Sequence, residues 1–305
     1  MVSFRRELHR HPEVSGAEKA TRQRVLNALE GTGAEITTFE GHYGVMAVLR
    51  NGKGPCVAVR ADMDALPIQE ETGLDFASEH PGVMHACGHD VHMALAATTE
   101  RWLSRNRDSW HGEVRFLFEP QEETVGGAKF MADAGCVEGV DCIIGQHVNP
   151  SYPAGTYFCK PGFVSGSSDE ITIIVRGKSC HGAYPERGVD AILIASHLVT
   201  ALQSLVSRHI SPFDPAVLTI GIMRGGRAKN IVCEEMDLEG TLRPLRKETR
   251  QDLHREIHRI CQDVATAFGG EAEARIAPSY GAVYNSERFY PVVEQVAREV
   301  FGEEG

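Results

Sequence analysis

The stretch VMHACGHDVHMA, residues 83–94, carries three histidines, one cysteine and one aspartate within eight positions. It comes directly before a segment with a helical pattern. Imidazole, thiolate and carboxylate groups are donors that borderline divalent cations accept. Taken alone, the stretch leaves two interpretations open: its side chains hold a metal ion, or they form an accidental polar cluster on a loop.

Three further stretches place metal-binding side chains directly after a predicted strand or at its end. They are RADMDALP (60–67) with Asp62 and Asp64, FEPQEET (118–124) with Glu122 and Glu123, and GQHVNP (145–150) with His147. In an α/β sheet, the loops at the carboxyl ends of the strands gather at one edge, where ligands from several segments can converge. Together with Cys87 and His89, these side chains predict a site for a divalent ion.

Each stretch also has a simpler interpretation when it is taken alone. A histidine at a strand end, such as His147, is more often a satisfied polar residue than a ligand, and an isolated Cys-x-His is more often structural. Asp62 and Asp64 could form turns, and adjacent glutamates are common on solvated surfaces. The metal interpretation is favoured because four independent loops carry suitable donors.

The remaining histidines receive other interpretations. His85 and His92 are candidates for supporting the metal ligands from behind. His9 and His11 are predicted on a loop or a helix surface. A last pair is predicted on one solvated helix face: His254 and His258.

The adjacent glutamates can divide two tasks between them. Neighbouring side chains diverge in extended backbone, so one of Glu122 and Glu123 can bind a metal while the other faces a substrate. A carboxylate beside a metal-bound water can take its proton and later deliver it to a leaving amine. The predicted chemistry is metal-assisted hydrolysis of an amide.

Alternating strand and helix patterns surround these stretches. Apolar or β-branched runs bounded by glycine or proline predict strands, and amphipathic runs predict helices. The predicted strands are 35–40, 44–50, 56–61, 113–120 and 142–148, and the predicted helices are 17–30, 90–106 and 126–135. Continuous apolar strands that alternate with helices indicate an α/β fold.

A second unit is predicted after the small, polar stretch at 163–170. Its predicted order is strand, helix, strand, strand, helix, strand, over 171–176, 188–208, 216–222, 234–243, 247–268 and 271–277. This β-α-β-β-α-β order is the ferredoxin-like arrangement, which can close as a compact unit. One more helix is predicted at 286–302.

The composition argues against several classes of protein. The 305 residues carry 42 acidic and 31 basic side chains without a basic cluster among aromatics, so a nucleic-acid surface is not expected. The charged start MVSFRRELHRHPE does not resemble a signal peptide, and the apolar run at 190–206 falls short of a membrane span. The eight cysteines lack a tight framework, so we expect reduced thiols and a cytoplasmic location.

Six blocks of the sequence match the pattern of a known family in its order and at its spacing. They are LHRHPEVSGAE, VRADMDALPIQEETGLDFAS, HPGVMHACGHDVHMA, PQEETVGGAKFM, GVDCIIGQHV and GKSCHGAYPERGVDAI. Through these blocks the chain resembles the M20 metallopeptidase and amidohydrolase family over essentially its whole length. The resemblance is to the branch of N-acyl-amino-acid amidohydrolases that includes hippurate hydrolase and the auxin-conjugate hydrolases.

The resemblance implies a dinuclear metal site with Glu122 as general base and acid. Two divalent ions per subunit are implied, either zinc or manganese, with nickel or cobalt as alternatives. Asp62 and Asp64 would lie close behind the ligands. The implied protein ligands are Cys87, His89, Glu123 and His147.

The resemblance also implies two domains. A catalytic α/β domain with a mixed central sheet would comprise 1–164 and 278–305, and a ferredoxin-like lid at 165–277 would join two subunits as a homodimer. Family members continue for roughly half a domain beyond the position of Gly305, in a tail that completes the sheet and supplies a further histidine ligand. We therefore expect the C-terminal part of the catalytic domain to be missing from this chain, and one metal position to lack a protein ligand. Cys233 lies in a segment that usually contains a proline, which should affect only a turn.

Three residues of the predicted lid receive roles from the resemblance. His181 would reach the partner's active site and stabilise the tetrahedral oxyanion, with support from Asn230. Arg243 would hold the substrate carboxylate bidentately, which explains how an acidic protein binds an anion. Without the resemblance, His181 and Asn230 would be interpreted as turn residues and Arg243 as a solvated strand end.

The predicted function is metal-dependent hydrolysis of the amide bond of an N-acyl amino acid, either N-acetyl, N-benzoyl or similar. The products are a carboxylate and a free amino acid, and Glu122 activates the metal-bound water. The expected partner is this small molecule, with no nucleic acid or membrane. Two alternatives stay open: an M20-type dipeptidase or carboxypeptidase with the same machinery, and a non-catalytic dimeric fragment or degenerate relative.

Overall fold

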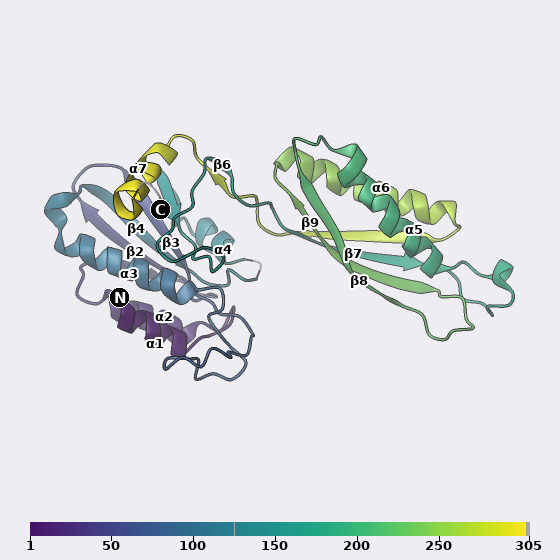
Figure 1. Cartoon of the computed structure of the whole chain (residues 1–305), viewed down its shortest axis with the longest axis horizontal. Coiled ribbons are helices and arrows are strands. Elements are labelled where there is room, and N and C mark those ends of the chain that lie inside the picture. Colours follow the sequence, from purple (N-terminus) through teal and green to yellow (C-terminus); the bar gives the residue numbers. More distant parts are fainter. Residues whose placement is uncertain (125, 303–305) are drawn as a thin grey trace. The chain divides into compact units, whose positions relative to one another are not determined.

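The computed structural model describes residues 1–124 and 126–302. The chain divides into two compact units, Met1–Ala154 and Gly155–Gly305 (Figure 1). The helices of the first unit are α1 (Val2–Arg10), α2 (Lys19–Leu29), α3 (His89–Arg105) and α4 (Gly127–Asp133). Its strands are β1 (Glu35–Thr38), β2 (Val45–Asn51), β3 (Cys56–Asp62), β4 (Gly112–Glu119) and β5 (Cys142–Gly145).

The strands of the first unit form one mixed sheet in the order β1-β2-β4-β3-β5. β2 is antiparallel to β1 and β4, whereas β3 is parallel to both β4 and β5. In this register Asp62 pairs with Glu119, so β3 and β4 end side by side. The carboxyl ends of β3, β4 and β5 therefore lie at one edge of the sheet. The predicted α/β class with a mixed central sheet is confirmed.

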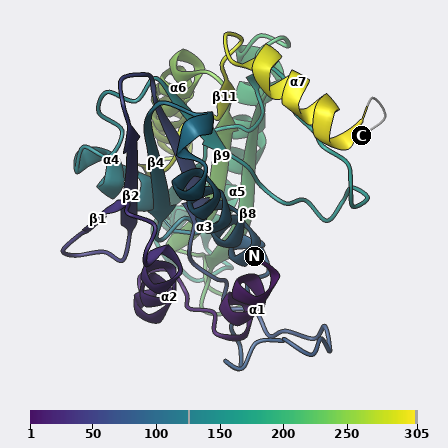
Figure 2. The ribbon, with the colours of Figure 1, turned by 90° about the vertical axis from the view of Figure 1, so that its left-hand side faces the viewer.

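Alternation along β4 gives this sheet two apolar faces. Phe116 and Phe118 are fully buried in the core formed with α1, α2 and α3, while Leu117 points to the other face, against Met131 of α4. Burying each such side chain contributes about 1.5–3 kcal/mol. Figures 1 and 2 show α1 and α2 beside α3 at one face of the sheet. Packing on both faces fixes the sheet edge that carries the candidate ligands.

Helix α1 places His9 inside the protein. The prediction that His9 lies on a loop or a helix surface is wrong, because the residue is only 3% exposed. Its Nδ1 lies 2.8 Å from Oδ2 of Asp90, and its Nε2 lies 3.3 Å from Oε1 of Glu70. Buried carboxylates need hydrogen-bond partners, and an imidazole on the inner side of α1 supplies one.

The second unit contains a four-stranded antiparallel sheet. Its elements are β6 (Gly162–Phe163), β7 (Asp169–Arg176), α5 (Ala191–Ser204), β8 (Ala216–Gly225), β9 (Glu235–Pro244), α6 (Lys247–Ala267), β10 (Glu271–Pro278), β11 (Tyr284–Asn285) and α7 (Tyr290–Phe301). The sheet order is β10-β7-β9-β8, and β6 pairs with β11. The chain order β7-α5-β8-β9-α6-β10 is the expected β-α-β-β-α-β arrangement. The lid role and the boundaries at 164/165 and 277/278 stay predictions.

Helices α5 and α6 cover one face of this sheet (Figure 1). By length and composition alone, Ala191–His209 is long and apolar enough to cross a membrane. However, Ile194, Leu198 and Leu202 are fully buried in the core of the unit. These positions recur at helical spacing, so the apolar character of this segment is explained by packing on the sheet.

A buried carboxylate ties α6 to the start of β7. Asp169 is fully buried and accepts hydrogen bonds from Nε of Arg250 at 3.0 Å and from Nε2 of His254 at 2.6 Å. The prediction that His254 and His258 share one solvated helix face is therefore wrong for His254. Arg250 and His254 lie one helical turn apart, so both reach the same buried group.

Candidate metal centre

The sharp turn before α3 brings two of the predicted ligands close to the end of β5. Gly88 has a φ of 90°, and a Cβ there would lie 2.3 Å from a methyl carbon of Val148. Only glycine fits this left-handed position against its neighbour. Cys87 and His89, on either side of the turn, consequently lie near His147.

Donor atoms from all four predicted stretches meet around His89. They form three groups in which the possible ligand atoms lie within 4.8 Å of one another. The groups are Cys87, His89 and His147; His89, Glu122 and Glu123; and Asp62, His89 and His92. His89 belongs to each group, so the three groups form one continuous cluster at the sheet edge.

Two buried atoms of this cluster lack hydrogen-bond partners among the described residues. They are Nε2 of His89 and Oε1 of Glu123, which lie 3.7 Å apart. The other nitrogen of His89, Nδ1, lies 2.8 Å from the backbone oxygen of Asp64 and donates its proton there. Nε2 therefore presents a lone pair to the carboxylate, and leaving both atoms unsatisfied is costly. A cation between them satisfies both, so the residues fit a bound metal.

Cys87 and His147 offer a second pair of donors. The sulfur of Cys87 lies 3.2 Å from Nε2 of His147, and Nδ1 of His147 donates to the backbone oxygen of Val148 at 2.6 Å. Burial, the hydrogen bond with Glu123 and the nearby carboxylates raise the pKa of Cys87 to about 12. Without a cation the thiol stays protonated, whereas a bound metal would stabilise the thiolate.

Asp62 is buried beside these donors, and its oxygens are already engaged. Nδ1 of His92 lies 2.6 Å from Oδ1, and Nη1 of Arg60 lies 2.6 Å from Oδ2. Burial alone would raise the pKa of Asp62, but the hydrogen bond with His92 and the charge of Arg60 lower it below its ordinary value. His92 also accepts the backbone N–H of Val148 at 3.0 Å, so it links Asp62 to the loop that carries His147.

Asp64 fixes the backbone of the glutamate pair. Its Oδ1 accepts the N–H of Glu122 at 3.1 Å, and its Oδ2 accepts the N–H of Glu123 at 3.0 Å. Oδ2 also accepts the hydroxyl of Ser15 at 2.5 Å. One buried carboxylate thus sets the position of both residues in the loop after β4.

Glu122 lies at the accessible side of the cluster. Its side chain is 32% exposed, and Oε2 lies 3.9 Å from Nε2 of His89. Burial raises the pKa of Glu122 above its ordinary value, with the charges of Asp62 and Glu123 adding to this effect and those of Arg60 and His89 opposing it. A carboxylate with a raised pKa is better matched to proton transfer near neutral pH.

Arg60 is a site residue that the sequence reasoning missed. Its Nε lies 2.5 Å from Oε2 of Glu119, its Nη1 bonds Asp62, and its Nη2 lies 3.9 Å from Glu122. A usable signal was present, because an arginine in the apolar strand CVAVRAD shares a face with Asp62 two positions later. It supplies the positive charge that a group of carboxylates needs.

Of the residues predicted in the second unit, two lie together and one lies apart. His181 forms a β-bridge with Ile231, and the N–H of Gly182 donates to the backbone oxygen of Asn230 at 2.8 Å. Arg243 is exposed near the other end of β9. It lies eight positions after Glu235 at the start of this strand, which corresponds to about 26 Å of strand length.

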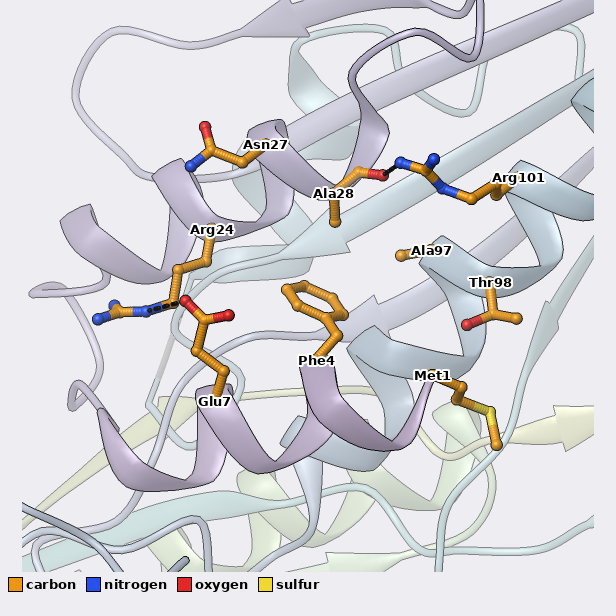
Figure 3. Close-up of a pocket in the computed structure, with 9 residues that line it drawn as sticks. All are labelled: Met1, Phe4, Glu7, Arg24, Asn27, Ala28, Ala97, Thr98 and Arg101. Carbon is orange, nitrogen blue, oxygen red and sulfur yellow. Dashed lines mark hydrogen bonds and ion pairs between the residues drawn. The ribbon is translucent and has the colours of Figure 1, made fainter.

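A separate pocket of about 380 Å³ opens between α1, α2 and α3 (Figure 3). Its lining residues are Met1, Phe4, Glu7, Arg24, Asn27, Ala28, Ala97, Thr98 and Arg101. Arg24 pairs with Glu7 within the pocket, and Arg101 donates to the backbone oxygen of Ala28. None of the predicted site residues lines it.

Comparisons with known proteins extend over both units. A family model described as Peptidase family M20/M25/M40 matches residues 58–305. The N-acetylcysteine deacetylase of Bacillus subtilis is 38% identical over 97% of this chain and 79% of its own length. The N-acyl-L-amino acid amidohydrolase of Geobacillus stearothermophilus is 39% identical over 95% of this chain and 79% of its own length.

A solved structure from Bacillus subtilis is also similar. It is described as a dinuclear metal binding peptidase from the M20 family. It matches with a TM-score of 0.84 and 34% identity, and the match covers 98% of this chain and 78% of that chain.

Proposed function

The chain belongs to peptidase family M20/M25/M40, and from this premise we propose that it is a metal-dependent amidohydrolase that cleaves N-acyl amino acids. The products would be a carboxylate and a free amino acid. The observation that carries the proposal is the cluster around His89, where thiol, imidazole and carboxylate donors meet beside a partly accessible glutamate. The names of the two relatives support the same class of substrate.

Cys87, His89, Glu123 and His147 would hold the metal, and the solved relative supports two ions rather than one. The mixture of sulfur, nitrogen and oxygen donors suits zinc or manganese, with nickel or cobalt as alternatives. When bound, divalent ions would polarise the amide carbonyl and lower the pKa of the attacking water. Asp62 and Asp64 would orient the imidazoles of His92 and His89 from behind.

Glu122 would transfer the proton. As general base it would take a proton from the attacking water, and as general acid it would deliver this proton to the leaving nitrogen. Its raised pKa and its partial exposure suit both steps, because the group must reach the substrate and exchange a proton near neutral pH. Arg60, on the inner side of Glu122, would keep the neighbouring carboxylates ionised.

Arg243 would bind the substrate carboxylate through its guanidinium fork, and His181 with Asn230 would stabilise the oxyanion. His181 and Asn230 lie at the segment before β9, and Arg243 lies near the end of β9. The length of this strand is greater than the length of a small N-acyl amino acid. This separation supports a homodimer in which His181 and Arg243 of one subunit act in different active sites, with His181 in the site of the partner subunit. A cytoplasmic location stays a prediction, which the eight free thiols support.

The decisive experiment combines a substrate screen with one substitution. The chain should hydrolyse N-acetyl or N-benzoyl amino acids when manganese, zinc, cobalt or nickel is added, and elemental analysis should find two ions per chain. Glu122→Gln should lower kcat on the order of 10²–10⁴-fold at unchanged metal content. Glu138→Gln, at an exposed glutamate of the same unit, serves as the matched control. Absence of hydrolysis with every substrate and metal would refute the proposal.

A further inference from the structure

The loop that carries the glutamate pair begins in an unusual backbone conformation. Gln121 has a φ of 56°, and it is the one non-glycine residue with positive φ in the described part of the chain. Residues with a Cβ rarely adopt this left-handed conformation, so the surrounding structure must impose it. Gln121 directly precedes Glu122, and its backbone direction therefore determines where both glutamates begin.

Glu18 contacts this backbone from the start of α2. Its Oε1 accepts the N–H of Gln121 at 2.8 Å, across 103 positions of the chain. The side chain is fully buried, and Oε2 has no hydrogen-bond partner among the described residues. A buried carboxyl group without a paired cation costs free energy of folding. The burial of Glu18 is therefore better explained by its hydrogen bond to the backbone of Gln121 than by a contribution to the free energy of folding.

The local fold releases Glu18 for this contact. Glu18 occupies the N-cap position of α2 but makes no side-chain cap there. Glu13 caps the helix instead, because Oε2 accepts the N–H of Thr21 at 2.7 Å and its hydroxyl at 2.9 Å. The backbone oxygen of Glu13 also accepts the N–H of Ala65 at 2.8 Å. The segment 13–18 is therefore anchored at both ends beside the glutamate loop.

Glu18 and Asp64 together bind three consecutive backbone amides. Glu18 accepts the N–H of Gln121, and Asp64 accepts those of Glu122 and Glu123. We propose that Glu18 is a positioning residue, which holds Gln121 in its left-handed conformation and thereby aims the glutamate pair into the metal cluster. The roles of the two glutamates rest on the proposed function, but the positioning itself is a property of the backbone.

The test uses three substitutions at Glu18 in the full chain. Glu18→Ala removes the acceptor, Glu18→Asp keeps the carboxyl group but shortens the reach, and Glu18→Gln keeps an oxygen acceptor at the same distance. Glu100→Ala, at an equally buried carboxylate on α3, is the matched control. Hydrogen–deuterium exchange of the backbone amides at 121–124 reports on the loop independently of activity. Initial rates and bound metal are measured in parallel.

We expect faster exchange at 121–124 in Glu18→Ala and Glu18→Asp, and near wild-type exchange in Glu18→Gln and Glu100→Ala. On N-acetyl amino acids, kcat should fall roughly 10–100-fold in the first two variants with little change in KM, and Glu18→Gln should restore it. If Glu18→Ala does not fold, Glu18→Asp carries the comparison. Unchanged exchange in Glu18→Asp, or equal loss in Glu18→Gln, would overturn the proposal. An inactive wild-type chain would instead refute the proposed function, while the exchange data would still decide the positioning.

Discussion

The sulfur of Cys87 lies 3.2 Å from Nε2 of His147, although 60 positions separate the two residues in the chain. The contact joins the turn before α3 to the loop after β5, so it depends on the folded sheet edge. Burial and the neighbouring carboxylates raise the pKa of Cys87 to about 12, so the thiol stays protonated unless a cation stabilises the thiolate. Its chemistry, and that of His147, is therefore best tested through metal binding.

Cys87→Ser should lower the affinity for the metal more than about 100-fold. Loss of a residue that only hydrogen-bonds a metal ligand typically lowers this affinity roughly 10–100-fold. A serine hydroxyl is a much poorer donor for a borderline cation than a thiolate. Competition with a chelator, followed by elemental analysis, measures the effect. Cys142→Ser, on the neighbouring strand β5, is the control, and equal metal retention in both variants would contradict the assignment.

Removal of metal should lower the melting temperature of the chain. A ligand present at 100 times its Kd stabilises the native state by about 2.7 kcal/mol. For a unit of this size, that corresponds to a shift of roughly 5–11 °C. Calorimetry with and without chelator measures it, and Cys87→Ser should show a smaller shift. Identical melting curves in the wild type would argue that no metal is bound.

Asp169→Asn should destabilise the second unit by about 1–3 kcal/mol at pH 7, because charged hydrogen bonds with Arg250 and His254 are weakened. Burial alone would raise the pKa of Asp169, but these partners lower it below its ordinary value. The stabilisation is therefore complete above the unfolded pKa, near 3.9, and is lost as pH falls through the lower folded value.

Urea unfolding at several pH values checks this dependence. The difference between wild type and Asp169→Asn should be constant from neutral pH to about pH 5 and should shrink below it. Asp263→Asn is a control on α6, the helix that carries Arg250 and His254, because Asp263 is exposed and pairs at the surface with Arg259. A difference that grows towards acid would contradict stabilisation by the ionised carboxylate.

The residues of the metal cluster could be predicted from the sequence because each one is identified by the residues next to it in the chain. Asp62 ends β3, and Glu122 and His147 follow β4 and β5; each strand is recognisable from its own residues, and parallel strands end at the same edge. The apolar runs of β3, β4 and β5 were sufficient to find these positions. Arg60 was overlooked although the same alternation places it on the face of Asp62.

The contacts that support the site and the second unit could not be predicted from neighbouring residues. Glu18 and Gln121 are 103 positions apart, and Asp169 and His254 are 85 positions apart. Nothing in the residues near either partner specifies such a contact, because a polar residue at a helix start or on a helix flank normally faces water. The burial of His9 was missed for the same reason, since its partner Asp90 lies in another helix.

Arg243→Lys should raise KM for N-acyl amino acids roughly 10–100-fold, with a smaller effect on kcat. A lysine keeps the charge but loses the paired hydrogen bonds to a carboxylate, and each such bond contributes about 1.5–3 kcal/mol. Steady-state kinetics on an N-acyl amino acid and on its amide analogue measure the effect. On the amide analogue, the KM of Arg243→Lys should differ much less from that of the wild type. An equal rise in KM on both substrates would contradict a contact between Arg243 and the substrate carboxylate.

Complementation between two inactive variants tests whether His181 acts in the partner's site. Glu122→Gln retains His181, and His181→Ala retains Glu122.

If each active site combines Glu122 from one subunit with His181 from the other, subunit exchange between the variants creates one complete site per mixed dimer. Random mixing of equal amounts should then restore about a quarter of wild-type activity, because half of the dimers are mixed and each carries one working site. If His181 acted within its own subunit, every site in the mixture would lack one group and no activity would return. His181 is exposed and bridges Ile231, which precedes β9, whereas Arg243 lies near the far end of that strand; this separation favours the first outcome.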